Sequence, residues 1–149
     1  VEKYESIIRS FDLDSKYIQL EITESATIDN NEIFNLLEQF HTAGFKILLD
    51  DFGSGYSSLA ALNRMHFDTI KLDKSLIDYI GDRNGEKLLL HITQLLQSFG
   101  MTITAEGVET SDQVEFLKNL HCDDIQGYYF SKPLPVNEFE DFVRKHTGL

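Results

Sequence analysis

The chain contains a single cysteine and two prolines among its 149 residues. One cysteine, Cys122, can form neither an internal disulfide framework nor a thiolate cage around a metal, and we interpret it as a half-buried structural thiol. No apolar run approaches the roughly 20 residues that cross a membrane, and the first residues form a charged amphipathic pattern instead of a signal peptide. The sequence therefore predicts no membrane contact by this segment and a cytoplasmic setting.

Basic residues are also scarce. Thirteen Lys and Arg stand against 25 Asp and Glu, which gives a formal net charge of −12. Because basic footprints drive the binding of nucleic-acid polymers, this balance argues against such a partner. It allows a small phosphorylated ligand, because metal ions held by clustered carboxylates reverse the local potential. The five histidines include no pair with HExxH-like spacing, so we interpret them as surface or packing residues.

Short β-favouring runs alternate with helix patterns along the chain. The runs cover residues 18–22, 45–50, 69–73, 101–105 and 124–130. Apolar residues at helical spacing predict helices over residues 33–40 and 88–99, and a final helix is predicted over residues 136–146, after Pro133 and Pro135. Gly44 and Gly100 stand where helices should end, and Thr110 to Gln113 has the spacing of a capping box before a further helix. Residues 81–85 are predicted to form a surface loop.

This alternation is typical of parallel strands joined by crossover helices, and no linker divides the chain. An open doubly wound sheet and a TIM-type barrel both fit it. Polar residues lie on or just after every strand: Glu21, Asp50, Asp51, Lys71, Asp73, Glu106 and Gln126. The carboxyl ends of barrel strands converge on one mouth, whereas those of an open sheet spread along a line. The sequence therefore predicts an α/β fold of the TIM-type (β/α) barrel class.

The most informative stretch is Asp50-Asp51, which ends an apolar strand and opens onto a loop rich in glycine and serine. Adjacent carboxylates repel each other and are costly to desolvate unless a cation or proton compensates them. A strand end of this kind, followed by backbone that can approach a ligand closely, indicates a divalent metal site facing a phosphate. Carboxylates from neighbouring strands frame two-metal phosphoester hydrolysis, so Asp50 or Asp51 could bridge two ions and Glu21 could complete the shell of one.

Three further strand-end residues suit the same chemistry. The Lys71 ammonium could hold the attacking water or neutralise a phosphate oxygen. Glu106 could ligate a metal or accept a proton, and Gln126 could orient a water or a ligand amide. The alternative for each residue taken singly is a surface ion pair or an ordinary polar residue at the end of a strand.

Five ordered segments together resemble the EAL-domain cyclic-di-GMP phosphodiesterases over essentially the whole chain. They are LEITES at 20–25, DDFGSGYSSL at 50–59, IKLD at 70–73, AEGVET at 105–110 and QGYYFSKPLP at 126–135. The resemblance implies a modified TIM barrel that uses Mg²⁺ or Mn²⁺, in a two-metal site, to open cyclic di-GMP to linear pGpG. It also implies a homodimer or higher oligomer.

The resemblance implies a role for each matching residue. The metal ligands would be Glu21, Asp50 and Asp51. The residues around the catalytic water would be Lys71, Asp73 and Glu106, with Gln126 nearby. The supporting residues would be Glu24, which anchors the loop 51–58, together with Glu109, Gly53, Ser54 and Gly55.

The sequence departs from the family pattern at its beginning. In the family, a Glu-Ala-Leu strand and a strand with a metal-binding asparagine lie upstream of the first motif, and neither occurs here. Residues 1–10 match the helix before the family's fourth strand, so we expect about five of eight strands, too few to close a barrel. We therefore expect residues 1–149 to be the C-terminal portion of an EAL-type phosphodiesterase domain, inactive or impaired on its own.

Two other hypotheses remain open. A truncated barrel exposes an unpaired edge, and a second copy could pair with it. The chain would then be a non-catalytic module that senses cyclic di-GMP or dimerises. An unrelated metal-dependent barrel enzyme acting on phosphate esters is the third possibility.

Overall fold

The computed structural model describes residues 1–27, 31–54 and 59–147. Its strands are β1 (Gln19–Thr23), β2 (Lys46–Phe52), β3 (Thr69–Leu72), β4 (Thr102–Ala105) and β5 (Asp124–Ile125). All four neighbouring pairs are parallel, and the strands lie in chain order, β1-β2-β3-β4-β5. A doubly wound sheet would reverse its strand order at a switch point, whereas a barrel wall runs in sequence. The prediction of an α/β fold with a partial barrel of about five parallel strands is confirmed.

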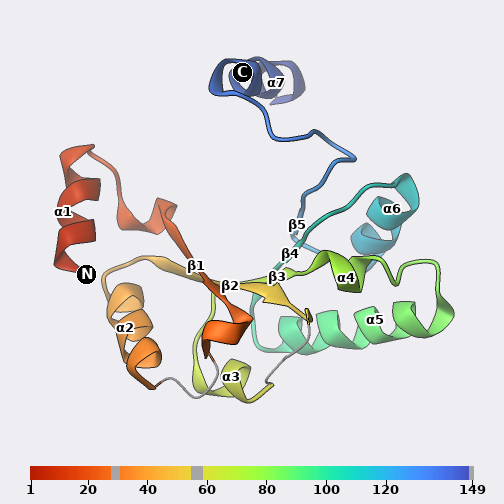
Figure 1. The fold of residues 1–149 in the computed structure, drawn as a ribbon, viewed down its shortest axis with the longest axis horizontal. Helices are drawn as coiled ribbons and strands as arrows, with labels where there is room; N and C mark the ends of the chain where they lie inside the picture. The colour runs from red at the N-terminus through yellow and green to blue at the C-terminus, as the bar shows by residue number, and fades with distance from the viewer. Residues whose placement is uncertain (28–30, 55–58, 148–149) are drawn as a thin grey trace.

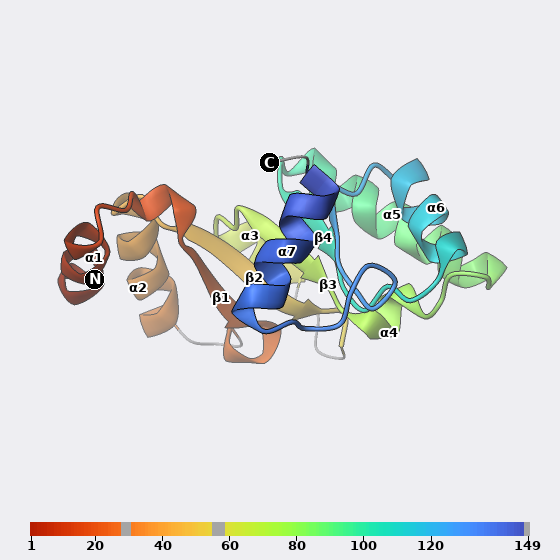
Figure 2. The ribbon, with the colours of Figure 1, turned by 90° about the horizontal axis from the view of Figure 1, so that it is seen from above.

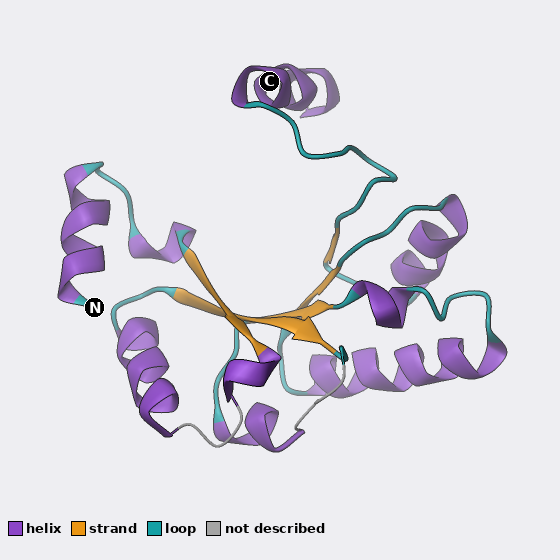
Figure 3. Cartoon of the chain, viewed as in Figure 1, coloured by secondary structure: helices purple, strands orange, loops and turns teal. Residues whose placement is uncertain are grey.

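Seven α-helices and two short 3₁₀ turns are described. The helices are α1 (Glu2–Ser10), α2 (Asn31–Thr42), α3 (Leu59–Arg64), α4 (Lys74–Ile77), α5 (Arg83–Ser98), α6 (Ser111–Asn119) and α7 (Val136–Thr147), and the turns are η1 (Ser15–Tyr17) and η2 (Glu24–Thr27). Helices α2, α3 and α5 lie along one side of the sheet, and α7 lies over the opposite side (Figures 1 to 3). None of the described helices is long and apolar enough to cross a membrane.

The hydrophobic core lies between the sheet and the helices that cover it. Ile47, Leu49, Ile70, Leu72 and Ile103 are almost completely buried there. Because successive strand residues point to opposite faces, the residues between them face the other side of the sheet. That side carries the polar strand-end residues, so the side-chain alternation separates the core from the site.

The fifth strand is shorter than predicted. The prediction of a strand over residues 124–130 was wrong, since β5 covers Asp124–Ile125 alone. A Cβ atom on Gly127 would lie 2.1 Å from the carbonyl oxygen of Val108, so the chain passes tightly against that backbone. The Tyr129 N–H donates to the Val108 oxygen at 3.0 Å and the Phe130 N–H to the Gly127 oxygen at 3.1 Å. These bonds form a turn instead of a strand.

The predicted surface loop at residues 81–85 was also wrong. Helix α5 begins at Arg83, because the Asp82 side chain accepts the backbone N–H groups of Asn84 and Gly85 at 3.0 and 2.8 Å. A Cβ atom on Gly85 would lie 2.5 Å from the Cβ of Tyr79, which explains a glycine inside the first turn. Aspartate is a preferred N-cap residue, and this signal was present in the sequence.

Other predicted helix ends are confirmed. Gly44 and Gly100 have φ angles of +87° and +74°, the left-handed conformation that favours glycine after a helix. The Thr110 hydroxyl accepts the Gln113 N–H at 3.2 Å, and the Gln113 side-chain oxygen accepts the Thr110 N–H at 3.1 Å. This reciprocal capping box starts α6.

Candidate active site

Lys71 lies at the centre of a cluster of carboxylates from neighbouring strands. Its ammonium nitrogen is 3.0 Å from Oδ1 of Asp50 on β2 and 3.5 Å from Oε1 of Glu21 on β1. It also forms an ion pair with Glu106, which directly follows β4. The Lys71 side chain is 11% exposed. The structure therefore brings together four residues that the sequence predicts for the site.

The charges of this cluster do not cancel. Burial disfavours the Lys71 ammonium, but hydrogen bonds and charge attraction from Glu106 and Asp50 outweigh burial and raise the pKa of Lys71 above its usual 10.5. The Lys71 side chain is therefore cationic at neutral pH. Three carboxylates around one ammonium give a formal charge of −2 in a site where the Asp50 and Glu106 side chains are 20% and 22% exposed. Such a site attracts cations.

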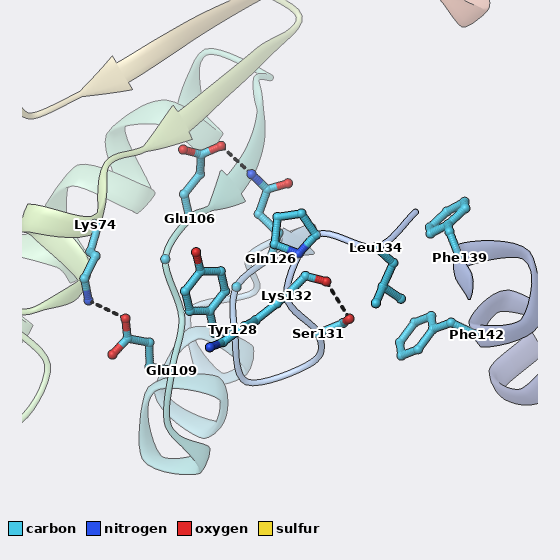
Figure 4. Close-up of a pocket in the computed structure, with 13 residues that line it drawn as sticks. Lys74, Glu106, Glu109, Gln126, Tyr128, Ser131, Lys132, Leu134, Phe139 and Phe142 are labelled. Carbon is cyan, nitrogen blue, oxygen red and sulfur yellow. Dashed lines mark hydrogen bonds and ion pairs between the residues drawn. The ribbon is translucent and has the colours of Figure 1, made fainter. Parts of the chain in front are cut away.

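Gln126 fixes the position of the Glu106 carboxylate. Its side-chain amide donates a hydrogen bond to Oε1 of Glu106 (Figure 4). The same oxygen also pairs with Lys71. The backbone N–H of Gln126 donates to the Ala105 oxygen at 2.9 Å, and that of Glu106 donates to the Leu72 oxygen at 3.1 Å. The extension of the strand ladder past β3 and β4 thus positions both side chains.

Asp51 has an unusual backbone conformation. Its φ angle is +57°, and the register of β2 against β3 shifts between Leu49 and Phe52. The Asp51 N–H donates to Oδ1 of Asp50 at 3.0 Å, and its carbonyl oxygen accepts the Ser54 N–H at 3.1 Å. Irregularities of this kind re-aim side chains at strand ends and cluster at functional sites.

The segment after Asp51 is held from two sides. Glu24 is 3% exposed, and its Oε2 accepts the N–H of Gly53 at 3.4 Å. Gly53 has a φ angle of +95°, and a Cβ atom there would lie 2.3 Å from Cδ1 of Leu76. Gly55, the remaining glycine of the predicted supporting set, lies outside the described residues.

Asp73 and Glu109 lie beside the cluster and have other contacts. The Asp73 carboxylate accepts the Ser75 N–H at 2.9 Å and caps α4. The Ser75 side chain, helped by this backbone N–H, outweighs burial and lowers the pKa of Asp73. The Glu109 carboxylate pairs with the Lys74 ammonium at 3.2 Å. Lys74 is not among the residues that the sequence predicts for the site. The only available signal for Lys74 was its place directly after Asp73.

The donor set fits a divalent cation in kind. Mg²⁺ and Mn²⁺ prefer carboxylate oxygens, which Glu21, Asp50, Asp51 and Glu106 supply. Within residues 1–27, 31–54 and 59–147, however, no three His, Cys, Asp or Glu side chains are grouped as metal ligands. The Lys71 ammonium lies among the carboxylates in this arrangement and offsets one of their three negative charges. Cys122 adds no ligand, because burial, together with Asp123, raises its thiol pKa to about 12.

A cavity of about 690 Å³ adjoins Glu106 and Gln126. Its size is within the usual range for small-molecule sites. Figure 4 shows the residues that line it, which include Lys74, Tyr128, Lys132, Phe139 and Phe142. It combines the Lys132 ammonium with aromatic rings, which suits a ligand that has both phosphate and a flat ring.

Comparison with known proteins identifies the family. The sequence profile of the EAL domain matches residues 1–133. The chain belongs to the EAL domain family. The predicted resemblance to the EAL-type cyclic-di-GMP phosphodiesterases is thereby confirmed.

Individual relatives resemble this EAL chain over most of its length. The cyclic di-GMP phosphodiesterase NbdA of Pseudomonas aeruginosa is 39% identical over 132 residues, which are 87% of this chain and 17% of NbdA. The EAL domain of Mycobacterium smegmatis DcpA has a TM-score of 0.89 at 32% identity, with 97% of this chain and 66% of that chain covered. Klebsiella pneumoniae BlrP1, in a complex with manganese and cyclic di-GMP, has a TM-score of 0.79 at 30% identity and coverages of 85% and 33%. The EAL chain thus spans only part of each relative.

Proposed function

We propose that residues 1–149 form the C-terminal portion of a domain that hydrolyses cyclic di-GMP to linear pGpG with the help of divalent metal ions. The convergence of Glu21, Asp50 and Glu106 on Lys71 is the observation that carries this proposal. The phosphodiesterase NbdA and the BlrP1 complex with manganese and cyclic di-GMP support it. Because the substrate is a second messenger of the cytoplasm, we place the domain there.

Glu21, Asp50 and Asp51 would hold the Mg²⁺ or Mn²⁺ ions of a two-metal site. Bound ions of this kind lower the pKa of water and neutralise charge on a phosphoryl group. The residual negative charge around Lys71 and the oxygen donors at the ends of β1 and β2 favour such ions over any other cofactor.

The other side chains of the cluster would position the attacking water and transfer its proton. Hydrolysis adds one water across one P–O bond of the ring and leaves a 5′-phosphate and a 3′-hydroxyl. The Lys71 ammonium would hold the attacking water or a phosphate oxygen. Glu106, oriented by Gln126, would accept a proton from that water. Asp73 would be placed beside the water by its position at the start of α4.

We further propose that this chain alone is inactive or impaired. The described sheet is open at β1 and β5, and DcpA, whose chain is longer, contains more of the domain. Missing strands could come from a longer chain or from a second copy that pairs with an open edge as a homodimer or oligomer. Nothing in the proposal requires a nucleic-acid polymer or a membrane.

A second candidate function is a non-catalytic module that binds cyclic di-GMP or dimerises. It is favoured by one observation: no group of metal ligands is found in the described part of the chain. Ligand binding would then require neither metal ions nor turnover.

Chromatography of cyclic di-GMP incubated with the chain and Mg²⁺ or Mn²⁺ separates these functions, with Asp50→Asn as the control. Formation of pGpG that disappears in Asp50→Asn and with a chelator supports hydrolysis. Binding of cyclic di-GMP that is lost with chelator and in Asp50→Asn, even without turnover, is expected of an incomplete catalytic domain. Binding that is unaffected by chelator and by Asp50→Asn supports the non-catalytic module.

A further inference from the structure

Lys74 occupies a fixed position between β3 and the end of β4. It is the first residue of α4, whose N-cap Asp73 accepts the Ser75 N–H at 2.9 Å. This cap starts the helix directly after β3, the strand that carries Lys71. The chain therefore places Lys74 beside the segment 106–109, in which Glu106 is the first residue.

The stem of Lys74 packs on the backbone of Gly107. A Cβ atom on Gly107 would lie 2.7, 2.8 and 2.9 Å from Cβ, Cγ and Cδ of Lys74. The lysine methylenes thus fill the space that any larger residue at 107 would need. Gly107 also has a φ angle of +70°, so glycine is favoured there for two reasons.

The ammonium of Lys74 reaches past Gly107 to the far end of the segment. It lies 3.2 Å from Oε1 of Glu109 and 2.9 Å from Oδ1 of Asp78 (Figure 4 draws the pair with Glu109). The side chains of Lys74 and Glu109 are 45% and 50% exposed, so the ion pair adds little to global stability. Its effect is local, because it fixes one end of the segment to α4.

The residues after β5 hold the opposite side of the same segment. The Val108 N–H donates to the Gln126 oxygen at 3.2 Å, and the Val108 oxygen accepts the Tyr129 N–H at 3.0 Å. Gly127 packs directly on the Val108 backbone. The segment that carries Glu106 is therefore enclosed between Lys74 and residues 126–129.

We propose that Lys74 is a positioning residue for Glu106. Its stem and its ion pair with Glu109 hold the segment 106–109 so that the Glu106 carboxylate meets Lys71 and Gln126. The catalytic consequence rests on the proposed function, but the structural role does not. Lys74 acts through Glu106 in this account, and contact with substrate is not required.

Three variants of the chain test this role. Lys74→Ala removes the stem beyond Cβ and the ion pair, Lys74→Arg retains both, and Arg9→Ala removes a comparable exposed ion pair with Glu5 in α1. Alanine is a good helix former, so α4 and its cap remain. We expect amide hydrogen exchange at Val108 to be roughly tenfold faster in Lys74→Ala and unchanged in the other two variants.

The side-chain amide resonance of Gln126 provides a second readout, because this group donates to Glu106. We expect the resonance to move in Lys74→Ala and to return in Lys74→Arg. An unchanged Val108 exchange rate in Lys74→Ala, or no rescue by Lys74→Arg, would overturn the proposal. So would an equal acceleration at the core amides of β3, which indicates global destabilisation.

Turnover of cyclic di-GMP is measured on the same proteins. We expect a lower kcat with unchanged KM in Lys74→Ala, whereas a higher KM with unchanged kcat indicates substrate contact and overturns the positioning role. Absence of pGpG in the unchanged chain agrees with the proposal that the chain alone is inactive. The exchange rates and the Gln126 resonance then still decide the role of Lys74.

Discussion

Replacing Lys71 with methionine tests the electrostatic balance of the candidate active site. Methionine keeps most of the stem volume but leaves the carboxylates of Glu21, Asp50 and Glu106 without their shared cation. Breaking a buried ion pair costs about 3–5 kcal/mol, and partial exposure of the carboxylates reduces this. We expect a loss of about 2–3 kcal/mol in the free energy of unfolding at pH 7 without divalent ions.

The loss should depend on metal. Added Mn²⁺ should restore part of the stability, because it replaces the missing charge. The free energy of unfolding of the parent chain should fall at high pH. Its raised Lys71 pKa gives stability that is complete below pH 10.5 and is lost as pH rises through the folded-state value.

Urea denaturation followed by circular dichroism measures these differences at each pH. Lys46→Met is the matched control, because Lys46 also forms an ion pair on a neighbouring strand, with Asp68, but is 48% exposed. It should cost no more than about 1 kcal/mol. Equal stability of Lys71→Met and the parent chain at pH 7, or no recovery of Lys71→Met on addition of Mn²⁺, would refute the reasoning.

Three further predictions concern packing, capping and metal binding. Gly127→Ala should destabilise the chain by about 1–3 kcal/mol in urea denaturation, because the new methyl group would meet the Val108 backbone; a cost below 0.5 kcal/mol would contradict this. Asp82→Ala should lower the free energy of unfolding by about 1 kcal/mol and speed amide exchange at Gly85. Asp112→Ala, an exposed control, should change neither stability nor exchange. Unchanged exchange at Gly85 in Asp82→Ala would count against the cap. Mn²⁺ should broaden the NMR resonances of Glu21 before those of α7, and Asp50→Asn should weaken this effect; uniform broadening would indicate non-specific binding.

The architecture and the central cluster could be predicted because both follow from local patterns. Alternating apolar residues set the core face of each strand, and parallel strands in chain order bring their ends together. Glu21, Asp50, Lys71 and Glu106 therefore converge for the same reason that their strands form. The alternation of strands and helices alone fits two α/β folds. The EAL motifs added the identity of the family.

The errors all involve contacts between segments distant in the sequence or a neglected cap. Residues 126–130 are rich in aromatic side chains and resemble a strand, but Gly127 meets Val108 and turns the chain. Lys74 could not be recognised, since its role depends on packing against Gly107, 33 positions further along. The start of α5 differs from the prediction for another reason: the composition of residues 81–85, with Gly81 and Gly85, is typical of a loop, but the Asp82 side chain caps the first turn of the helix.

The most direct test of the account joins this chain to the N-terminal third of an EAL domain such as that of DcpA and measures conversion of cyclic di-GMP. The account predicts pGpG in the presence of Mn²⁺ and its loss on Asp50→Asn or Lys71→Met. A fused protein that is folded and binds cyclic di-GMP but forms no pGpG would contradict the claim that these strand ends form a phosphodiesterase site.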